Sequence, residues 1–277
     1  MERPFVKITE QPSPYDDLEH KSAGELLRCM NEQDKLVAPA VERALPQIEQ
    51  LVIRLTERMA RGGRLFYLGA GTSGRLGVLD ASEIPPTFGM PPTLVVGLIA
   101  GGDRALRNPV EGAEDDPRQG WLDLAAHAPT PDDTVVGIAS SGTTPYVVGA
   151  VREARSRGLL TAGITSNPGS PLSAEAEIAI ETAVGPEVVT GSSRLKSGTA
   201  QKMVCNMITT ATMVRLGRVR GSRMVNMQLS NRKLIDRGTR MIVEETGTEY
   251  NVAKNLLLLY GSVSAALEAL RDRQTEI

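Results

Sequence analysis

Two glutamates and a set of hydroxyl-rich loops are the parts of this sequence best suited to chemistry. Glu83 lies in the run DASEIPP, and Glu114 lies in the run EGAEDDP. Two carboxylates can divide acid and base work when their surroundings separate their pKa values, so that one is ionised and the other protonated. Such a pair without histidines or metal ligands nearby indicates proton transfer at carbon rather than metal-assisted hydrolysis.

The chain is poor in the residues that carry most other chemistries. Its 277 residues include two histidines, His20 and His127, and two cysteines, Cys29 and Cys205. Two cysteines cannot supply a thiolate zinc site, and neither histidine lies near a glycine-rich loop, so a zinc centre or a Ser-His-Asp triad is disfavoured. We therefore expect no metal and no cofactor, and we assign acid–base work to carboxylates, lysines or tyrosines.

The composition also excludes several kinds of partner. The 31 basic and 33 acidic residues give a formal charge of −2, and aromatic residues make up 3% of the chain. Nucleic acid is a poor candidate, because its binding needs excess positive charge and stacking aromatics. No apolar run approaches the roughly 18 residues that span a bilayer, and the N-terminal residues lack the apolar core of a signal peptide. We expect a soluble, cytoplasmic protein that binds no membrane.

The first hydroxyl-rich loop, GAGTSG at 69–74, directly follows a strand-like run and opens a helical one. Its G-x-G-x-x-G spacing is shared with dinucleotide sites, but the acidic residue expected about 20 residues later is missing. The hydroxyls of Thr72 and Ser73, together with backbone N–H groups at a helix N-terminus, suit a phosphate monoester. Ordinary helix capping by either hydroxyl is the third interpretation.

A second loop, SSGTTP at 140–145, has the same setting. Thr144 is explained as a helix N-cap, with a proline at the first helical position. Helix capping does not explain Ser140, Ser141 and Thr143. Two such loops from different strands are suited to clamp the phosphate of a sugar phosphate.

A third stretch, GPEVVTGSSRLKSGT at 185–199, precedes a long helical run. Ser192, Ser193 and Lys196 lie within it. These residues either bind an anion or cap the helix, and the sequence favours neither interpretation over the other.

Alternating strand-like and helical runs predict the elements that position these loops. Strands are expected at 64–68, 94–99, 134–139, 160–165 and 177–181, and helices at 73–81, 117–126, 145–157 and 196–216. This order is typical of an α/β fold with a parallel sheet covered on both faces. Because ligands bind beyond the carboxyl ends of such strands, the loops after the strands are the ones that should carry the site.

Helical segments flank this central block. Residues 1–21 are expected to be an extended arm, and a capping box of Ser22 and Glu25 opens a helix that ends near residue 34. A second helical pattern stops at Gly62, and three helices are expected in the tail at 231–245, 250–259 and 263–271. We divide the chain into an N-terminal arm and helix at 1–44, an α/β domain at 45–219 and a small helical tail at 220–277.

The expected helix boundaries also bear on the two glutamates. Glu83 is predicted to lie just past the helix that the first loop opens, where the negative helix end would raise the pKa of its carboxyl and favour a protonated acid. Glu114 lies in the long connection between the second and third strands, and long connections are more often functional than idle.

Several segments of the chain are shared with one known family. They include GRLFYLGAGTSGRLGVLDASEIPPTFG, VVGLIAGGDRAL, EGAEDDP, NPGSPL, GPEVVTGSSRLKSGTAQKMV and NMITTATMVRLG. Through them the chain resembles the N-acetylmuramic acid 6-phosphate etherases over most of its length. The segments around Glu83 and Glu114 are specific to that group, whereas the hydroxyl-rich loops alone indicate the wider sugar-isomerase (SIS) domain class.

The resemblance implies an SIS fold with a five-stranded parallel sheet, working as a cytoplasmic homodimer. It implies a lyase of amino-sugar recovery that converts N-acetylmuramic acid 6-phosphate and water into N-acetylglucosamine 6-phosphate and D-lactate. The family's catalytic glutamates fall on Glu83 and Glu114. Its phosphate-binding hydroxyls fall on the two loops, at Thr72, Ser73, Ser140, Ser141 and Thr143. The family's usual arginine in the second loop is replaced here by Thr143.

The implied chemistry gives each glutamate a role. In the open-chain aldehyde the carbonyl acidifies the C2 proton, and the ether oxygen on C3 becomes a leaving group for syn elimination. We assign Glu114 as the C2 base and Glu83 as the acid that assists lactate departure, after which water adds at C3. Two alternatives share the fold: a non-catalytic sugar-phosphate sensor, and an aldose–ketose isomerase that returns the proton to C1. The presence of both glutamates favours the etherase.

Overall fold

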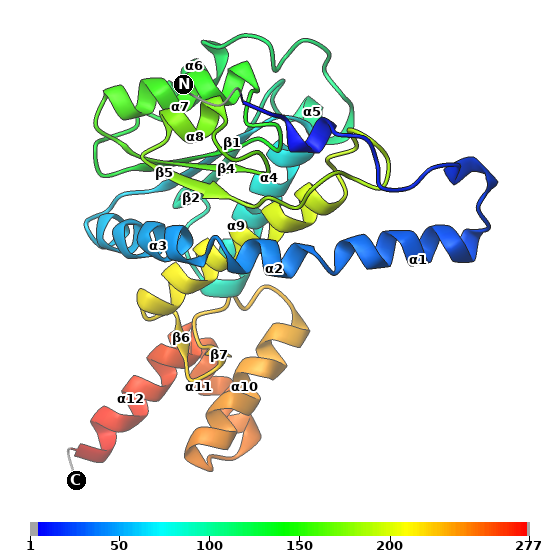
Figure 1. The fold of residues 1–277 in the computed structure, drawn as a ribbon. Helices are drawn as coiled ribbons and strands as arrows, with labels where there is room; N and C mark the ends of the chain where they lie inside the picture. Colours follow the sequence, from blue (N-terminus) through cyan, green and yellow to red (C-terminus); the bar gives the residue numbers. More distant parts are fainter. Residues whose placement is uncertain (1–4, 276–277) are drawn as a thin grey trace. The chain divides into compact units, whose positions relative to one another are not determined.

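The computed structural model describes residues 5–275, with side chains up to residue 271, and it contains the predicted five-stranded parallel sheet (Figure 1). The strands are β1 (Leu65–Gly69), β2 (Val95–Ile99), β3 (Thr134–Ile138), β4 (Leu160–Thr165) and β5 (Ile178–Glu181). Their order is β2-β1-β3-β4-β5, and every neighbouring pair is parallel. The predicted fold class is confirmed, and each strand lies within one residue of its predicted bounds.

The strand order explains why the loops after β1 and β3 matter. β2 is added on one side of β1, and β3, β4 and β5 are then added on the other side. The order in which strands are added therefore reverses between β1 and β3, although all the strands are parallel. In open α/β sheets, ligands bind beyond the carboxyl ends of the strands at such a switch point. The first loop follows β1 and the second follows β3, so both open at this place.

The chain forms two compact units. The first comprises Met1–Ser82 and Thr93–Thr212, and the second comprises Glu83–Pro92 and Met213–Ile277. Elements that begin in the first unit are α1 (Ala23–Asp34), α2 (Val37–Glu42), α3 (Leu45–Ala60), α4 (Gly71–Phe88), α5 (Arg104–Arg107), α6 (Gln119–Ala125), α7 (Pro145–Ser156), α8 (Pro171–Glu175) and α9 (Lys196–Arg215). The last turns of α4 and α9 pass into the second unit.

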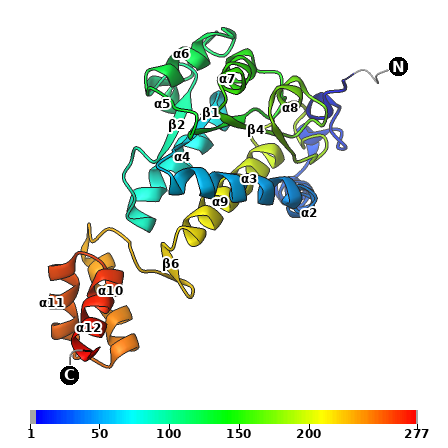
Figure 2. The same ribbon diagram turned by 90° about the vertical axis from the view of Figure 1, so that its left-hand side faces the viewer.

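Helices cover both faces of the sheet in the first unit (Figure 2). On one face, α6, α7 and α8 bury a core that includes Phe66 and Leu68 of β1 with Leu124, Val147 and Leu172. On the other face, the Tyr67 hydroxyl donates to the Cys205 carbonyl oxygen of α9 at 3.4 Å. Strands buried on both faces are near-continuous apolar runs, which is why the sequence pattern predicted them well.

The N-terminal segment is anchored to the sheet domain. The predicted capping box is confirmed: the Ser22 side chain at the start of α1 accepts from the Glu25 backbone N–H, and the Glu25 side chain accepts from the Ser22 backbone N–H. Before it, the predicted extended arm contains two short 3-10 turns, η1 (Ile8–Glu10) and η2 (Leu18–His20). Thr9 is buried against the second loop's neighbour Asn167. Its N–H donates to Asn167 Oδ1 at 3.1 Å, and its hydroxyl accepts from Asn167 Nδ2 at 2.9 Å.

The second unit is mainly helical. It contains β6 (Val219–Arg220), β7 (Arg223–Met224), α10 (Arg232–Thr246), α11 (Tyr250–Tyr260) and α12 (Val263–Thr275). The three helices confirm the prediction for the tail, whereas the short antiparallel pair β6–β7 was not predicted. Their apolar faces share one core that includes Ile242, Leu257 and Val263. Gly247 and Gly261 end α10 and α11 in the left-handed conformation that favours glycine.

Helix α4 is longer than predicted. We expected it to end near residue 81 because Pro85 and Pro86 follow, and a proline removes a helical hydrogen bond and crowds the preceding turn. That boundary is wrong: the helix continues through both prolines to Phe88. At its end, the Pro85 carbonyl oxygen accepts from the Gly89 N–H at 3.0 Å with the ordinary helical spacing, and the Pro86 carbonyl oxygen accepts from the Gln228 N–H at 3.2 Å.

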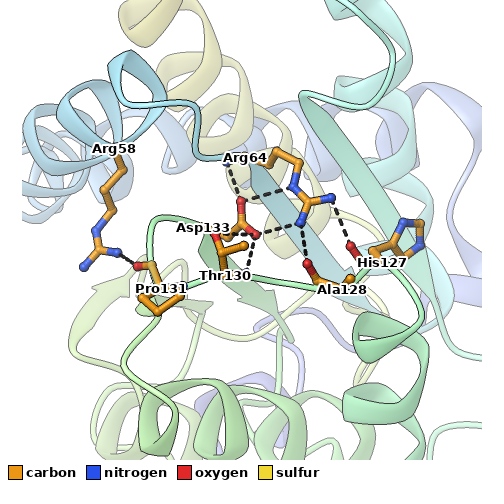
Figure 3. Close-up of polar contacts among 7 residues, drawn as sticks. All are labelled: Arg58, Arg64, His127, Ala128, Thr130, Pro131 and Asp133. Carbon is orange, nitrogen blue, oxygen red and sulfur yellow. Dashed lines mark hydrogen bonds and ion pairs between the residues drawn. The ribbon is translucent and has the colours of Figure 1, made fainter.

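A polar network lies at the opposite end of the strands from the ligand-binding loops, at the amino ends of β1 and β3 (Figure 3). Asp133 Oδ1 accepts from the backbone and Nε of Arg64 at 2.7 and 3.1 Å, and its Oδ2 accepts from Arg64 Nη2 at 2.8 Å. The Thr130 N–H also donates to Oδ2, at 2.7 Å. The remaining Arg64 donors bind the carbonyl oxygens of His127 and Ala128 at 3.1 Å. The two strands are thereby held in register away from the ligand-binding edge.

We expect Asp133→Asn to lower the free energy of unfolding by about 2 kcal/mol, since it breaks a largely buried ion pair with several hydrogen bonds. Burial raises the pKa of Asp133, but the hydrogen bonds from Arg64 and Thr130 outweigh it, and the net pKa lies below its ordinary value. A lowered pKa means that the stabilisation is present above the ordinary pKa and is lost as the pH falls through the folded-state pKa. Urea unfolding at pH 7 and at pH 3 measures both effects.

The neighbouring Asp132 provides the matched control. Its ion pair with Arg61 is about half exposed on both sides, so Asp132→Asn is expected to change stability by less than about 0.5 kcal/mol. Equal losses at the two positions, or a loss at Asp133 that does not shrink in acid, would contradict the role given to this network.

In the part of the chain that the structure describes, no helix is both long enough and apolar enough to cross a membrane.

Candidate functional site

The first loop turns sharply from β1 into α4. A side-chain carbon at Gly69 would lie 2.5 Å from the Gly74 backbone nitrogen, so this approach is open to glycine only. Gly71 has a φ of 53°, in the left-handed region. The turn places Thr72 and Ser73 in the first turn of α4, where Ser73 is buried and Thr72 is half-buried. The predicted setting of the two hydroxyls, at the mouth of a helix, is therefore present.

The buried side chain of Gln201 connects the first loop to the second. The Ser73 hydroxyl donates to Gln201 Oε1 at 3.0 Å, and Gln201 Nε2 donates to the Ser140 hydroxyl oxygen at 2.8 Å. Gln201 lies on α9 and is fully buried. The Ser140 oxygen is an acceptor in this arrangement, so its own O–H is left to donate to another group. Two serines that are far apart in the sequence are thereby held together, as the clamp interpretation requires.

Sequence reasoning missed Gln201. It lies five positions beyond Lys196, inside a long helix, and neither its type nor its spacing marks it. The only signal was its place in the run LKSGTAQKMV, which follows the third loop. A glutamine at such a position is usually on the surface, and only the packing of α9 against both loops makes it a bridge.

The second loop is stabilised by bonds within itself and from β4. The Ser141 hydroxyl oxygen accepts from the backbone N–H of Thr143 at 3.2 Å and from its hydroxyl at 3.1 Å. The Ser140 carbonyl oxygen accepts from Thr165 Oγ1 at 3.2 Å and from Asn167 Nδ2 at 2.9 Å. As predicted, Thr144 occupies the N-cap position before α7, although its side chain makes no capping hydrogen bond.

A hydrogen bond between α4 and α9 helps to fix the helices that carry Ser73 and Gln201. The Asn206 side-chain amide on α9 donates to Asp80 Oδ1 on α4 at 2.7 Å. Asp80 is 5% exposed, and burial raises the pKa of its carboxyl. Because one carboxyl oxygen is bonded across the helix pair, α4 and α9 are fixed two turns beyond the loop that they both contact.

The third stretch caps α9, but through a residue that the sequence did not single out. The fully buried Glu187 carboxylate accepts from the backbone N–H groups of Lys196 and Ser197, each at 3.0 Å, and so caps α9. A capping interpretation is correct for this helix, but the capping residue is Glu187 rather than Ser192, Ser193 or Lys196. A carboxylate already fills the positive helix end, which removes it as a site for a second anion.

Lys196 itself is turned toward the N-terminal helix. Its Nζ donates to Gln33 Oε1 of α1 at 2.6 Å, and the residue is 1% exposed. Burial lowers the pKa of Lys196, and the nearby carboxylates of Glu187 and Asp34 oppose that shift.

Glu114 lies in a cavity that the first loop helps to form. The cavity has a volume of about 260 Å³, and its lining includes Ala70 and Gly71 of the loop together with Arg75, Glu111 and Glu114. The Glu114 carbonyl oxygen accepts from the Tyr146 N–H in the first turn of α7 at 3.0 Å. The backbone of Glu114 is therefore held between the first loop and the helix that the second loop opens.

Glu83 lies on α4 and belongs to the second unit. Its side chain is exposed. The prediction that it lies beyond a helix C-terminus is wrong, because α4 continues to Phe88, and the field of a helix end acts mainly within the last turn. The helix end is therefore no reason for an acid role, and that role stays a prediction.

Among the residues that the structure describes, no group of three or more His, Cys, Asp or Glu side chains is arranged to hold a metal ion. Cys29 and Cys205 are free thiols.

Comparison with known proteins identifies the family. A Bacteroides fragilis protein named N-acetylmuramic acid 6-phosphate etherase is 66% identical over 267 residues, covering 96% of this chain and 95% of the relative. A Porphyromonas gingivalis protein of the same name is 65% identical, covering 97% of this chain and 98% of the relative. The chain belongs to the N-acetylmuramic acid 6-phosphate etherase family.

Family models and solved structures place this etherase-family chain in the SIS fold. The model described as the glucokinase regulatory protein N-terminal SIS domain matches residues 47–155, and the SIS domain model matches residues 123–211. A Bacteroides fragilis protein assigned as a phosphosugar isomerase has a TM-score of 0.54 and 23% identity, covering 73% of this chain and 95% of that chain. The Neisseria gonorrhoeae phosphoheptose isomerase has a TM-score of 0.50 and 16% identity, covering 68% and 98%.

In this etherase-family chain, the Gln201→Leu substitution is expected to raise the KM for a sugar phosphate about tenfold, with a smaller effect on kcat. The change removes the donor to Ser140 and the acceptor for Ser73 while keeping the side-chain volume similar. Steady-state kinetics and phosphate-ester binding by calorimetry measure the effect. Thr199→Ala, at an exposed position of the same helix, is the control. An unchanged KM in the Leu variant would mean that the bridge does not support ligand binding.

Proposed function

We propose that this protein is an N-acetylmuramic acid 6-phosphate etherase, which cleaves the D-lactyl ether of its substrate to give N-acetylglucosamine 6-phosphate and D-lactate. The observation that carries the proposal is the position of Glu114 in a cavity walled by the first hydroxyl-rich loop, in a chain of this family. A carboxylate beside a phosphate-binding loop is the arrangement that C2 deprotonation of a sugar phosphate needs, with no histidine or metal required.

The phosphate is assigned to the hydroxyls of the two loops. Ser73 and Ser140 are pre-positioned through Gln201, and Thr72, Ser141 and Thr143 lie in the same two loops. A phosphate ester bound by hydroxyls and backbone N–H groups at helix starts needs few cations of its own. This supports phosphate binding even though Thr143 stands where the family's usual arginine would be.

The chemical step is assigned to the two glutamates. Glu114 takes the proton from C2 of the open-chain aldehyde, the C3–O bond of the ether breaks, and Glu83 supplies a proton to the departing D-lactate. Water then adds across the C2–C3 double bond, its oxygen going to C3 and a proton returning to C2. One molecule of water is consumed, so that atoms and charge balance. A homodimer and a cytoplasmic location belong to the same proposal and rest on the family.

Proton NMR of the purified protein with N-acetylmuramic acid 6-phosphate in deuterium oxide tests the proposal. The expected result is free D-lactate together with N-acetylglucosamine 6-phosphate that carries deuterium at C2. Binding of the substrate without lactate release or exchange would indicate a sugar-phosphate sensor instead. Exchange followed by a ketose product, with the lactyl group retained, would indicate an isomerase.

A further inference from the structure

The cavity that contains Glu114 has one cationic side chain in its lining, Arg75. Arg75 lies on α4 just after the first loop and is half-buried. Its Nε donates to the Leu106 carbonyl oxygen at 3.0 Å, and its Nη2 donates to the Ala105 carbonyl oxygen at 2.8 Å. These two bonds to the end of α5 hold the guanidinium in one orientation and leave Nη1 without an assigned partner in the described part of the chain.

The charge of this cavity does not match an anionic ligand unless Arg75 takes part. Glu111 and Glu114 also line it, so its carboxylates outnumber its cation. N-acetylmuramic acid 6-phosphate carries a second anion besides the phosphate, namely the carboxylate of the lactyl group. Glu111 and Glu114 are exposed, so solvent weakens their repulsion of a third carboxylate without removing it, and a carboxylate is better accommodated there beside a fixed cation.

The position of the lactyl group follows from the assigned chemistry. If Glu114 reaches the C2 proton, the neighbouring C3 with its lactyl ether lies within the same cavity. A guanidinium fixed by backbone carbonyls is pre-organised to bind a carboxylate, because its remaining N–H groups have a defined direction. The loops that bind the phosphate, in contrast, contain hydroxyls and no cation.

We propose that Arg75 binds the lactyl carboxylate of the substrate and so makes this site specific for the lactyl ether over the unsubstituted amino-sugar phosphate. The proposal rests on the proposed function and assigns a specificity-determining residue within that same site. It also gives Arg75 an orienting effect, since a bound carboxylate restricts rotation about the ether that must break.

Comparing two ligands that differ only in the lactyl group tests this assignment. Isothermal calorimetry measures the affinity of N-acetylmuramic acid 6-phosphate, in a Glu114→Gln background that prevents turnover, and that of N-acetylglucosamine 6-phosphate. Arg75→Gln is expected to weaken the first ligand at least about tenfold and the second less than about twofold. Arg75→Lys keeps the charge but not the fork, so an intermediate loss for the first ligand is expected.

Arg107→Gln is the matched control, because Arg107 is an exposed arginine of the adjoining α5 and does not line the cavity. Retained binding of N-acetylglucosamine 6-phosphate shows that the Arg75 variants are folded. An equal loss of affinity for both ligands would overturn the proposal, because Arg75 would then bind the phosphate or support the fold. Unchanged affinity for both ligands would also overturn it, because Arg75 would then contribute nothing to binding. Failure of the unmodified protein to release lactate would instead reject the proposed function.

Discussion

Glu114→Gln is expected to abolish lactate release and C2 deuterium exchange together, lowering both rates by at least about 10³-fold, within the range expected for removal of a general base. The amide is nearly the same size as the carboxylate but cannot accept a proton. The Glu114 carbonyl oxygen, which binds the Tyr146 N–H, belongs to the backbone and is unaffected. Affinity for N-acetylglucosamine 6-phosphate should therefore change little, which separates loss of the base from loss of the site.

Glu111 offers a matched comparison, because it is a second carboxylate in the lining of the same cavity. Glu111→Gln changes the charge of the cavity by the same amount as Glu114→Gln. It is expected to keep C2 exchange within about tenfold of the unmodified rate, because it is not assigned to the proton. Equal losses in the two variants would show that net charge, rather than a positioned base, decides the rate.

Glu83→Ala is expected to have a second large but different effect. Without a proton donor the lactate must leave as an unassisted anion, and lactate release should fall by at least about 10³-fold. The C2 proton is taken by Glu114, so exchange with deuterium oxide should persist. Proton NMR measures both rates in one sample.

The separation of the two rates tests the division of labour between the glutamates. Loss of exchange together with lactate release in Glu83→Ala would contradict it, and would make Glu83 part of the base or of the binding site. The acid role expected for Glu83 is not supported by a nearby helix end, since α4 continues past Glu83 to Phe88. Exchange in this variant is therefore the direct evidence that an acid role requires.

The proline pair shows where local reasoning about the fold failed. A helix that meets two prolines usually ends before them, and the sequence pattern of α4 gave no reason for an exception. At the end of this helix a residue far along the chain takes part, because the Gln228 N–H donates to the carbonyl oxygen of Pro86. A contact between residues about 140 positions apart cannot be inferred from the helix itself.

The binding site shows the same limit. The hydroxyls of Ser73 and Ser140 are recognisable from two local patterns, a glycine-rich turn and a capped helix start. Gln201, which joins them, is 128 residues from Ser73 and 61 residues from Ser140. Glu187 and Arg75 were missed for the same reason, since a carboxylate in a loop and an arginine on a helix are unremarkable until their partners are known.

The sequence by itself determined the parallel sheet, most helix positions and the family, because these follow from properties carried within short segments. Buried parallel strands need apolar runs, helix starts need capping residues, and family segments are continuous. Only the tertiary structure decided which side chains face one another: that Gln201 bridges the two loops, that Glu187 fills the end of α9, and that Arg75 shares a cavity with Glu114. The physical reason is that hydrogen bonds and electrostatic interactions act over a few ångströms of space, whatever the separation along the chain.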